Sequence, residues 1–479
     1  MHNDTIAAIA TPLGEGGLAV VRLSGPLALA IADKSFLPVG KNSLKPSAAA
    51  THTIQFGKIV RGKKTIDEVL LAVLRAPRAF TREDTVEITC HGGLLPAKLV
   101  LDTLLENGAR PAEPGEFTRR AFLNGRIDLA QAEAVADLIH SRTELALAAA
   151  NEQLAGKLSQ RINTLRDEMM HTLAHVEAHI DFPEEDIAPD TREQLVKQLE
   201  NGVKFMDELL RTANEGQILR RGIRAAIIGR PNVGKSSLLN QLLGHDRAIV
   251  SPIPGTTRDT IEETANIRGL PVVFIDTAGL REARDEIEQE GVRRSHESLA
   301  KSEFILHVLD ASEPLTAADK KYLDEFADKK RILVVNKVDL PRKWSAEELK
   351  RQVGVQALAC SPDKLKLELQ REAGAPIVEV CCLSGQGIET LKDAIKELVW
   401  SGEIKASILQ VMINSRHQDA LNRSRAATMR TLDALRADAT LELVAMDLRI
   451  AVNAIGEIVG KTATEDLLDS IFSQFCIGK

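Results

Sequence analysis

The chain has 479 residues, a net charge of −7 and only 3% aromatic residues, and at roughly 100–200 residues per domain its length suggests about three domains. The negative charge and the scarcity of aromatic rings exclude a surface that attracts nucleic acid everywhere, so contact with RNA must be local or supplied by a partner. Five cysteines without paired C-x-x-C spacing exclude a disulfide framework and structural zinc, and without a leader segment or an apolar run of ~18 residues we expect a cytoplasmic protein with no membrane contact.

Residues 1–122 predict an α+β domain. Apolar runs or alternating patterns at 18–23, 54–60, 69–74 and 86–89 lie between glycine and proline turn signals, which is typical of strands. Residues 94–105 follow Gly92 and Gly93 and show apolar side chains at helical spacing. We therefore expect several strands and a helix in this part.

Residues 129–213 predict helices. The segment is rich in Ala, Leu, Glu, Gln, Arg and Lys at helical period. Two proline steps, Phe182-Pro183 and Ala188-Pro189, interrupt the pattern. We therefore expect at least three long helical pieces.

A glycine-rich loop follows the apolar run at 223–228. Residues 229–237 read Gly-Arg-Pro-Asn-Val-Gly-Lys-Ser-Ser and match G-x-x-x-x-G-K-[ST] without a mismatch. A strand that turns through glycines into a helix aims backbone N–H groups at a β-phosphate. The Lys235 ammonium then reaches the β and γ oxygens, and the Ser236 hydroxyl can hold Mg²⁺. The loop predicts a nucleoside-triphosphate site.

Three further motifs specify the nucleotide. Asp276-Thr277-Ala278-Gly279 ends an apolar run, which places a carboxylate toward the Mg²⁺ shell and a glycine N–H toward the γ-phosphate. Asn336-Lys337-Val338-Asp339 ends a second run, and the Asp339 carboxylate can accept both N–H groups of a guanine edge, which adenine does not offer. Ser384-Gly385 would contact the guanine oxygen through its backbone. These motifs predict GTP, with Asn232, Val233, Gly234, Lys235, Ser236, Ser237, Ser251, Thr256, Thr257, Asp276, Thr277, Ala278, Gly279, Asn336, Lys337, Asp339, Ser384 and Gly385 as its contacts.

Helical texture resumes from about residue 404, with long amphipathic stretches at 420–437 and 441–459. Helices on both sides of a module whose ends usually lie close together favour one helical domain with the GTP module inserted into it, and two independent bundles are the alternative. The predicted fold is multidomain: an α+β N-terminal domain, an all-α domain and an inserted α/β P-loop domain of the Ras-like type. The expected limits are 1–122, 123–217, 218–398 and 399–479.

The hydrolytic groups are unusual. The position after Gly279 holds Leu280, where many GTPases have a glutamine that orients the attacking water. Another acid or an ion must take over. The charged segment at 281–288 offers acids, and the sequence pattern does not choose among its carboxylates. The Asn232 amide oxygen and loop carbonyls near Ser251, Ile253 and the Gly255–Asp259 switch can form a cage for a monovalent cation, which supplies the charge of an arginine finger. In the same switch, Thr257 is placed to add its hydroxyl to Mg²⁺.

These residues resemble a known family. The Gly-Arg-Pro-Asn-Val-Gly-Lys-Ser loop, the Gly-Thr-Thr-Arg-Asp switch and the Asp-Thr-Ala-Gly-Leu-Arg-Glu run are similar to those of the MnmE (TrmE) tRNA-modification GTPases. The resemblance extends to Cys90-His91-Gly92-Gly93, Pro114-Gly115-Glu116-Phe117-Thr118, the 128–134 segment and the terminal Phe475-Cys476-Ile477-Gly478-Lys479. It covers essentially the whole chain.

The resemblance implies a homodimer that binds 5-formyl-tetrahydrofolate or a related one-carbon folate and is activated by K⁺ and GTP. With a flavin-dependent partner, MnmG (GidA), which alone carries FAD, such proteins modify C5 of the wobble uridine of certain tRNAs. It further implies that Glu288 positions the water, with Lys235 and Arg281 as further catalytic residues, Arg281 by ordering the switch rather than as an arginine finger. The implied folate contacts are Arg22, Glu87, Arg126 and Lys479. The implied K⁺ ligands are Asn232, Ser251, Ile253 and Thr256, and those of Mg²⁺ are Ser236 and Thr257.

Cys476 and the function of the chain each have more than one interpretation. Cys476 is either a small residue that packs the C-terminal tail or a thiol that serves the one-carbon chemistry. The function has an alternative in a ribosome-assembly or RNA-binding GTPase with the same switch motif, and a third in a potassium-gated dimer scaffold without chemistry of its own. Folate binding distinguishes the first function from the other two.

Overall fold

The computed structural model describes residues 4–40, 44–181, 189–244, 262–275, 302–345, 349, 375–400 and 412–479. The chain divides into two compact units. The first contains Met1–Ala136, Glu152–Leu210 and Arg416–Lys479, and the second contains Asp137–Asn151 and Arg211–Ser415. Each unit is described by itself below.

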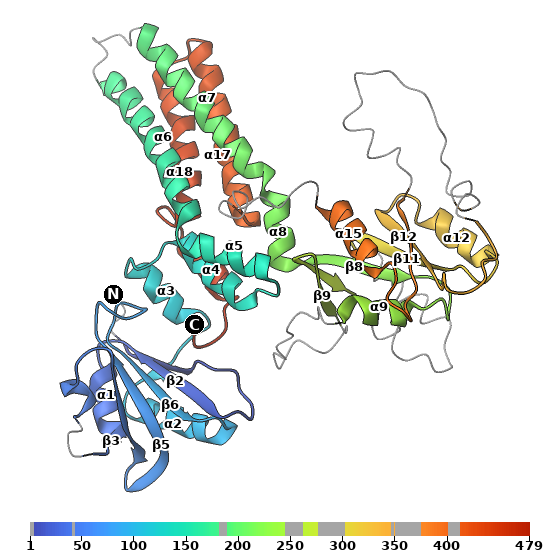
Figure 1. Cartoon of the computed structure of the whole chain (residues 1–479). Coiled ribbons are helices and arrows are strands. Elements are labelled where there is room, and N and C mark those ends of the chain that lie inside the picture. The colour runs from blue at the N-terminus through green and yellow to red at the C-terminus, as the bar shows by residue number, and fades with distance from the viewer. Residues whose placement is uncertain are drawn as a thin grey trace. The chain divides into compact units, whose positions relative to one another are not determined.

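The first unit begins with a seven-stranded sheet of order β3-β4-β5-β6-β2-β1-β7. Its strands are β1 (Ile6–Ile9), β2 (Leu18–Ser24), β3 (Phe36–Pro38), β4 (Thr53–Arg61), β5 (Lys64–Leu74), β6 (Thr85–His91) and β7 (Arg110–Pro111). Helices α1 (Ala28–Ser35) and α2 (Leu94–Glu106) pack on one face, over a core that includes Val21, Leu71 and Ile88. The four strands and the helix predicted for residues 1–122 are confirmed (Figure 1).

Alternation along the strands separates the two faces of this sheet. Val69, Leu71 and Val73 of β5 are buried beneath the helices, so Leu70 and Ala72 point to the opposite face. Pairing of Ala72 with Glu87, of Glu87 with Arg22 and of Leu70 with Phe56 puts these residues on that same face. The face away from α1 and α2 therefore carries both charged and apolar side chains.

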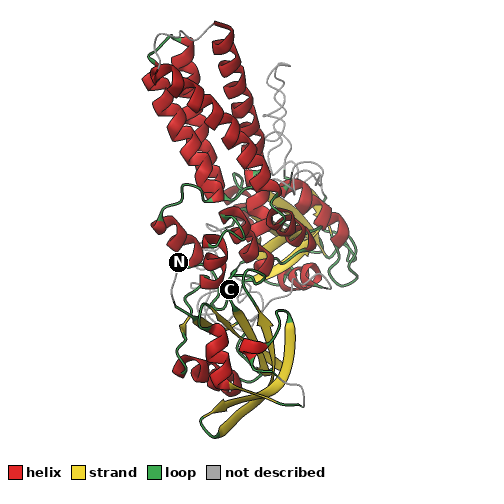
Figure 2. Ribbon diagram, turned by 90° about the vertical axis from the view of Figure 1, so that its left-hand side faces the viewer, coloured by secondary structure: helices red, strands yellow, loops and turns green. Residues whose placement is uncertain are grey.

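The rest of the first unit is helical. It contains α3 (Glu116–Leu123), α4 (Leu129–His140), α6 (Lys157–Asp181), α7 (Pro189–Arg211), α17 (Ser415–Arg436), α18 (Leu441–Val459) and α19 (Glu465–Phe472). Helix α6 buries side chains three or four residues apart, from Leu158 to Val176, against α18. Figures 1 and 2 show α7 and α17 beside this pair. Helix α6 ends just before Phe182-Pro183 and α7 starts at Pro189, where a proline needs no N–H partner.

A buried ion pair joins the early and late helices of this unit. Arg416, at the start of α17, donates from Nε and Nη2 to the two carboxylate oxygens of Glu133 on α4, each at 2.8 Å. His417 Nε2 lies 2.8 Å from the same carboxylate. Burial alone would raise the pKa of Glu133, but His417 and Arg416 hold it well below its usual range. Segments nearly 300 residues apart thus belong to one helical body.

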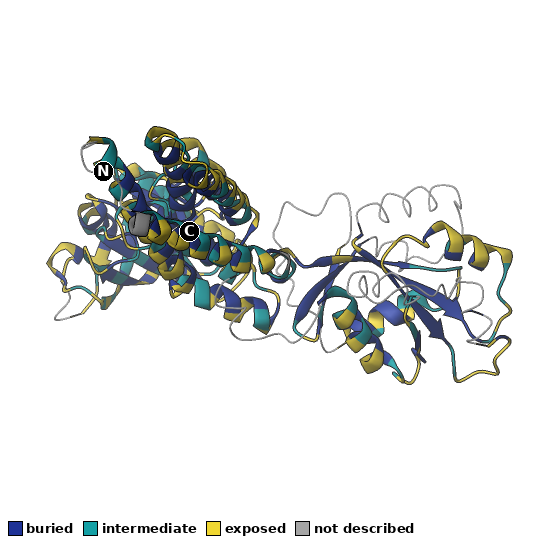
Figure 3. Cartoon of the chain, turned by 90° about the horizontal axis from the view of Figure 1, so that it is seen from above, coloured by how far each residue is buried: buried dark blue, intermediate teal, exposed yellow. Residues whose placement is uncertain are grey.

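The second unit contains a six-stranded sheet of order β13-β12-β11-β8-β10-β9. Its strands are β8 (Ile223–Ile228), β9 (Glu263–Ile267), β10 (Leu270–Phe274), β11 (Phe304–Asp310), β12 (Arg331–Asn336) and β13 (Ile377–Glu379). Among the described strands of this second sheet, only the β9–β10 pair is antiparallel. Every residue of β11 is buried, as a strand covered on both faces requires (Figure 3).

The helices described in the second unit are α5 (Glu144–Leu154, in part), α8 (Ala213–Arg221), α9 (Lys235–Leu243), α12 (Ala317–Glu325) and α15 (Ile388–Val399). This α/β sheet lies in the chain between α7 and α17, two helices of the first unit. The predicted fold class, with a P-loop module inserted into a helical domain, is confirmed. None of the described helices is both long and apolar enough to cross a bilayer.

Candidate functional site

The glycine-rich loop lies between β8 and α9. Gly229, with φ 146°, follows the strand, and Gly234, with φ 98°, is the N-cap of the helix. A Cβ on Gly234 would stand 2.1 Å from Asn336 Nδ2, so this position excludes any side chain. Asn232 adopts φ 62°, and its side chain is exposed. The N-terminal N–H groups of α9 follow the loop, which is the geometry of a phosphate site.

The Lys235 ammonium donates hydrogen bonds back to the start of the glycine-rich loop. Its Nζ donates to the Gly229 carbonyl at 2.9 Å and to the Arg230 carbonyl at 2.7 Å. Burial lowers the pKa of the Lys235 ammonium. The cation is thus held at the start of α9, where the backbone donors of the loop also converge, and a phosphate there would meet both.

Asn336 connects the phosphate loop with the base-reading motifs. Its Nδ2 donates to the Val233 carbonyl at 2.8 Å, and its Oδ1 accepts from the Cys382 N–H at 3.2 Å. Gln241 of α9 donates to the Cys382 carbonyl at 2.8 Å. The predicted contacts at 232–237, 336–337, 339 and 384–385 therefore gather where β8, β12 and β13 end, at the carboxyl edge of the parallel strands.

The residues around the expected base differ in exposure. Asp339 and Ser384 are exposed, and Leu383 is 88% exposed. Gly385 has φ 78° and donates its N–H to the Cys381 carbonyl at 2.9 Å. Lys337 pairs with Asp310 at 2.6 Å; burial alone would raise the pKa of Asp310, but the bonds from Lys337 and Ser312 lower it overall. An exposed carboxylate beside a rigid turn suits recognition of a base edge.

The switch residues of the prediction lie outside the described residues. These are Ser251, Ile253, Thr256, Thr257, Asp276, Thr277, Ala278, Gly279, Arg281 and Glu288. Ser236 and Ser237 are described and occupy the first turn of α9.

One contact of the phosphate loop has no counterpart among the residues predicted from the sequence. Arg230 Nε donates to Asp319 Oδ1 at 2.8 Å, and Arg230 Nη1 donates to Glu313 at 3.2 Å. Asp319 is buried and forms a capping box with Thr316 at the start of α12. The T-x-x-D spacing indicates the cap, but no local pattern shows that the same carboxylate holds the loop.

His307 is a buried histidine of the sheet below this loop. Residue 307 of β11 pairs with Ile228 of β8, and neither ring nitrogen has a hydrogen-bond partner in the described part of the chain. Burial, aided by the charge of Arg331 and opposed by that of Asp319, lowers the pKa of His307 to about 4. The neutral imidazole is therefore the form that the fold accepts.

Because His307 is buried in its neutral form, we expect the second unit to lose stability in acid. Between pH 6.5 and 4 the unfolded chain binds a proton at residue 307 that the folded chain does not, so the free energy of unfolding should fall by about 3 kcal/mol as the pH falls through that window. His307→Leu should remove that part of the pH dependence. Urea unfolding followed by tryptophan fluorescence measures it, because Trp344 and Trp400 both belong to the second unit. Identical pH dependence in the two proteins would contradict the assignment.

A second cluster lies in the first unit, on the sheet face opposite α1 and α2. Arg22 of β2 and Glu87 of β6 are directly opposite each other, and Arg22 Nε donates to Glu87 Oε1 at 2.8 Å. Arg22 Nη1 donates to the Gly478 carbonyl at 3.1 Å, and its guanidinium lies over the Phe117 ring at 5.5 Å. Two predicted folate contacts and the C-terminal tail are therefore brought together.

The tail reaches this cluster through close backbone approaches. Ile477 forms a β-bridge with Pro114, and the Gly115 N–H donates to the Cys476 carbonyl at 3.4 Å. Gly478 has φ 94°, and a Cβ there would lie 2.6 Å from the Ile9 carbonyl. Ile9 also lines a cavity of about 160 Å³ whose wall includes Gly14, Gly16, Gly92 and Gly93. Cys476 is exposed, which disfavours its interpretation as a packing residue.

Arg126 lies elsewhere, beyond the C-terminal end of α3. Its Nη1 donates to the Ala79 carbonyl at 3.4 Å, and its guanidinium lies over the Phe80 ring at 5.9 Å. Lys479 follows Gly478, and its N–H donates to the Cys476 carbonyl at 3.3 Å. The predicted folate residues thus form one group at Arg22, Glu87 and the tail, and a separate position at Arg126.

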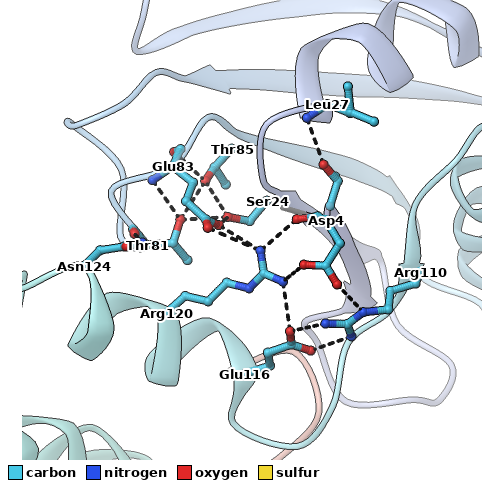
Figure 4. A network of polar contacts seen from close by, with 11 residues as sticks. Asp4, Ser24, Leu27, Thr81, Glu83, Thr85, Arg110, Glu116, Arg120 and Asn124 are labelled. Carbon is cyan, nitrogen blue, oxygen red and sulfur yellow. Dashed lines mark hydrogen bonds and ion pairs between the residues drawn. The ribbon is translucent and has the colours of Figure 1, made fainter. Parts of the chain in front are cut away.

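A charged network fixes α3 between these positions (Figure 4). Arg120 is 1% exposed and donates to Asp4 at 2.8 Å, to Glu116 at 2.9 Å and to Glu83 at 3.3 Å. Arg110 donates to the same Asp4 and Glu116 carboxylates at 2.6 and 2.5 Å. Burial alone would raise the pKa of Glu116, but the bond from Arg110 holds it below its usual range. The network holds α3, and with it Phe117 beneath Arg22.

The chain is similar along its whole length to characterised families. A family model described as "MnmE helical domain" matches residues 129–476, and one described as "GTP-binding protein TrmE N-terminus" matches residues 5–126. The "tRNA modification GTPase MnmE" of Bacillus velezensis is 46% identical over 99% of this chain and 100% of that protein. The protein of the same name from Geobacillus thermodenitrificans is 47% identical over 99% of each chain. The solved G domain of the T. maritima FeoB iron transporter is 27% identical and covers 37% of this chain and 98% of that one, with a TM-score of 0.24.

Proposed function

The chain belongs to the MnmE family of tRNA modification GTPases, and we propose that it is a potassium-activated GTPase that works with a flavin-dependent partner of the MnmG (GidA) type. Together they install an aminomethyl or carboxymethylaminomethyl group at C5 of the wobble uridine of certain tRNAs. The carbon comes from 5-formyl-tetrahydrofolate or a related folate, and FAD belongs to the partner only. We place this activity in the cytoplasm.

The observation that supports the proposal most is the convergence of Arg22, Glu87 and the C-terminal tail in the unit that also holds the N-terminal sheet. A pterin has a donor and acceptor edge that the Glu87 carboxylate can read, and a folate has an anionic glutamate that suits an arginine. We assign the edge to Glu87 and Arg22, the glutamate to Arg126, and a role in the one-carbon chemistry to the exposed Cys476 thiol. We also assign the cation of Lys479, the last residue of the tail, to the folate site.

In the nucleotide site, Lys235 neutralises the phosphates, Ser236 and Thr257 hold Mg²⁺, and Asp339 reads guanine. The hydroxyl of Ser236 fits a hard cation, since it stands in the first turn of α9 beside the phosphate loop. Asn232, Ser251, Ile253 and Thr256 are proposed ligands of K⁺. The exposed Asn232 amide, on a residue with φ 62°, is an oxygen donor of the required kind. We also propose the four domain segments expected from the sequence, 1–122, 123–217, 218–398 and 399–479.

The cation proposal predicts a strong dependence on the alkali ion. Na⁺ has shorter ion–oxygen distances and suits the cage poorly, so hydrolysis in Na⁺ should be slower by about tenfold or more. This factor is a small part of the rate increase of about 10³–10⁵-fold that an arginine finger supplies. GTP affinity should change little. Phosphate release in matched K⁺ and Na⁺ buffers measures this, and Asn232→Ala should remove most of the difference. Equal rates of the unaltered chain in both salts would rule out the cage.

We further propose that two copies of the chain associate. Ile54, Phe56 and Leu70 are 69%, 47% and 46% exposed, and their strands β4 and β5 place them on the sheet face of Arg22 and Glu87. A cluster of large exposed apolar side chains is typical of a protein interface. A homodimer through this face would cover them and bring the folate residues of two chains toward one interface.

The folate assignment predicts that full-length chain binds formyl-tetrahydrofolate and that Glu87→Gln weakens binding by about 10–100-fold, the effect of losing hydrogen bonds to a charged group. Isothermal titration calorimetry measures the affinity. Glu106→Gln is the matched control, because Glu106 is also a salt-bridged carboxylate of this unit but belongs to α2, on the other side of the sheet. If both variants keep the affinity of the unaltered chain, Glu87 does not belong to the site. If the unaltered chain does not bind the folate, the ribosome-assembly alternative is favoured.

A further inference from the structure

Three arginines gather at one end of the N-terminal sheet, and none of them pairs with a carboxylate of the described residues. Arg78 and Arg82 belong to the loop between β5 and β6, and Arg126 follows α3. All three are exposed. Arg82 Nη1 donates to the Asn124 carbonyl at 3.0 Å, and Asn124 Nδ2 donates to the Thr81 carbonyl at 2.7 Å. These bonds, with that from Arg126 to Ala79, hold the two segments together, so the three cations share one surface.

The neighbouring acids are already engaged. Glu83 accepts from Ser24 at 2.8 Å and from Arg120, and Asp84 accepts from the Ala76 N–H at 2.9 Å. Within the described ranges, no ion pair joins Arg78, Arg82 or Arg126 to a carboxylate, whereas exposed arginines such as Arg423 are paired. Like charges that share a surface repel one another, and a bound polyanion relieves that repulsion.

The position of this surface suggests which anion it receives. Phe117, which lies beneath Arg22, is the second residue of α3. Asn124, whose carbonyl accepts from Arg82, is the C-cap of the same helix. The two residues are therefore separated by about 10 Å along the helix. In a folate, an extended aminobenzoyl arm separates the pterin from the glutamate. A folate with its pterin near Arg22 therefore has its glutamate near the other end of α3, and further glutamates would continue onto the arginine surface.

We propose that Arg78 and Arg82 bind the γ-linked glutamates of a polyglutamylated folate, beyond the first glutamate at Arg126. The inference rests on the proposed folate function and names the form of the folate that the site takes. Each γ-linked residue adds a free α-carboxylate to the tail, and that carboxylate meets a guanidinium that forms no ion pair within the described residues. These charge-assisted bonds favour the longer tail.

The test compares monoglutamyl and pentaglutamyl formyl-tetrahydrofolate by calorimetry on the full chain. The unaltered protein should bind the pentaglutamyl form about tenfold tighter or more, as expected for one additional charge-assisted hydrogen bond, with a gain that shrinks as KCl rises. Arg78→Gln/Arg82→Gln should lose the gain and keep the monoglutamyl affinity within about twofold. Arg430→Gln/Arg449→Gln is the matched control, because it removes the same charge from exposed, ion-paired arginines of α17 and α18 and should keep the gain.

Equal affinity of the unaltered protein for both tail lengths would overturn the inference and leave the folate function intact. Binding of neither folate would instead overturn the folate function, and the inference with it. If the double variant keeps the tail-length gain but binds a tRNA transcript more weakly, the surface serves RNA phosphates and the inference is wrong.

Discussion

Replacing Asp339 by asparagine is expected to lower the affinity for GTP by about 10²–10⁴-fold and to raise the affinity for xanthosine triphosphate. The carboxylate accepts two N–H groups of guanine, and each bond to a charged group contributes about 1.5–3 kcal/mol. An asparagine offers one acceptor and one NH₂ donor, which matches the 2-oxo edge of xanthine. Asn336 stays locked to Val233 and Cys382, so the rest of the base site is retained.

Competition binding with GTP and xanthosine triphosphate measures both effects. Asp328→Asn is the matched control, since it removes one exposed carboxylate from the same unit without touching the base-reading motif. The control should bind GTP as the unaltered protein does. If Asp339→Asn keeps its GTP affinity, another group reads the base.

Replacing Glu288 by alanine is expected to slow the chemical step by about 10²–10⁴-fold with little change in GTP affinity. This is the usual contribution of a group that positions or accepts a proton in the transition state. The residue after Gly279 is Leu280, which can do neither, so the water needs an acid from the segment that follows. The role of Glu288 rests on family resemblance, because the segment lies outside the described residues.

Single-turnover hydrolysis in K⁺ separates the chemical step from binding and product release. Glu282→Ala, in the same charged segment, is the control and should change the rate only a few-fold. The opposite order of effects, with Glu282 essential and Glu288 dispensable, would move the catalytic acid to residue 282.

Local sequence signals predicted the elements with strong boundaries. Strand β8 and helix α18 have the bounds expected from the sequence, because Gly229 ends the run of β8 and Gly460, with φ 84°, caps α18. The proline steps predicted the end of α6 and the start of α7 for a similar local reason. The insertion could be inferred because helical texture appears on both sides of the GTP motifs.

Strand β13 is shorter than the mostly apolar stretch at 377–383 in which it begins. It ends at Glu379, and Cys381 forms only an isolated bridge with Gln386. The Cys382 N–H donates to the side-chain oxygen of Asn336 instead of to the backbone of the neighbouring strand β12, so the backbone turns early. Both cysteines are buried, but they follow the strand rather than belong to it.

Contacts between distant segments could not be predicted from local pattern. Family resemblance predicts Arg22 and Glu87 as folate contacts, but only the register of β2 on β6 shows that they face each other. The bonds of Arg120 to Asp4 and Glu83 join residues 116 and 37 positions apart. An arginine with 1% exposure has the same local signature as a solvated one, because its burial depends on where the sheet and α3 meet.

The most direct measurement is nucleoside analysis of tRNA from cells that lack this protein. The C5-modified wobble uridine should be missing and should return with the unaltered chain but not with Lys235→Ala, whose phosphate site has lost its cation. A normal level of the modified nucleoside in cells without the protein would contradict the proposed function.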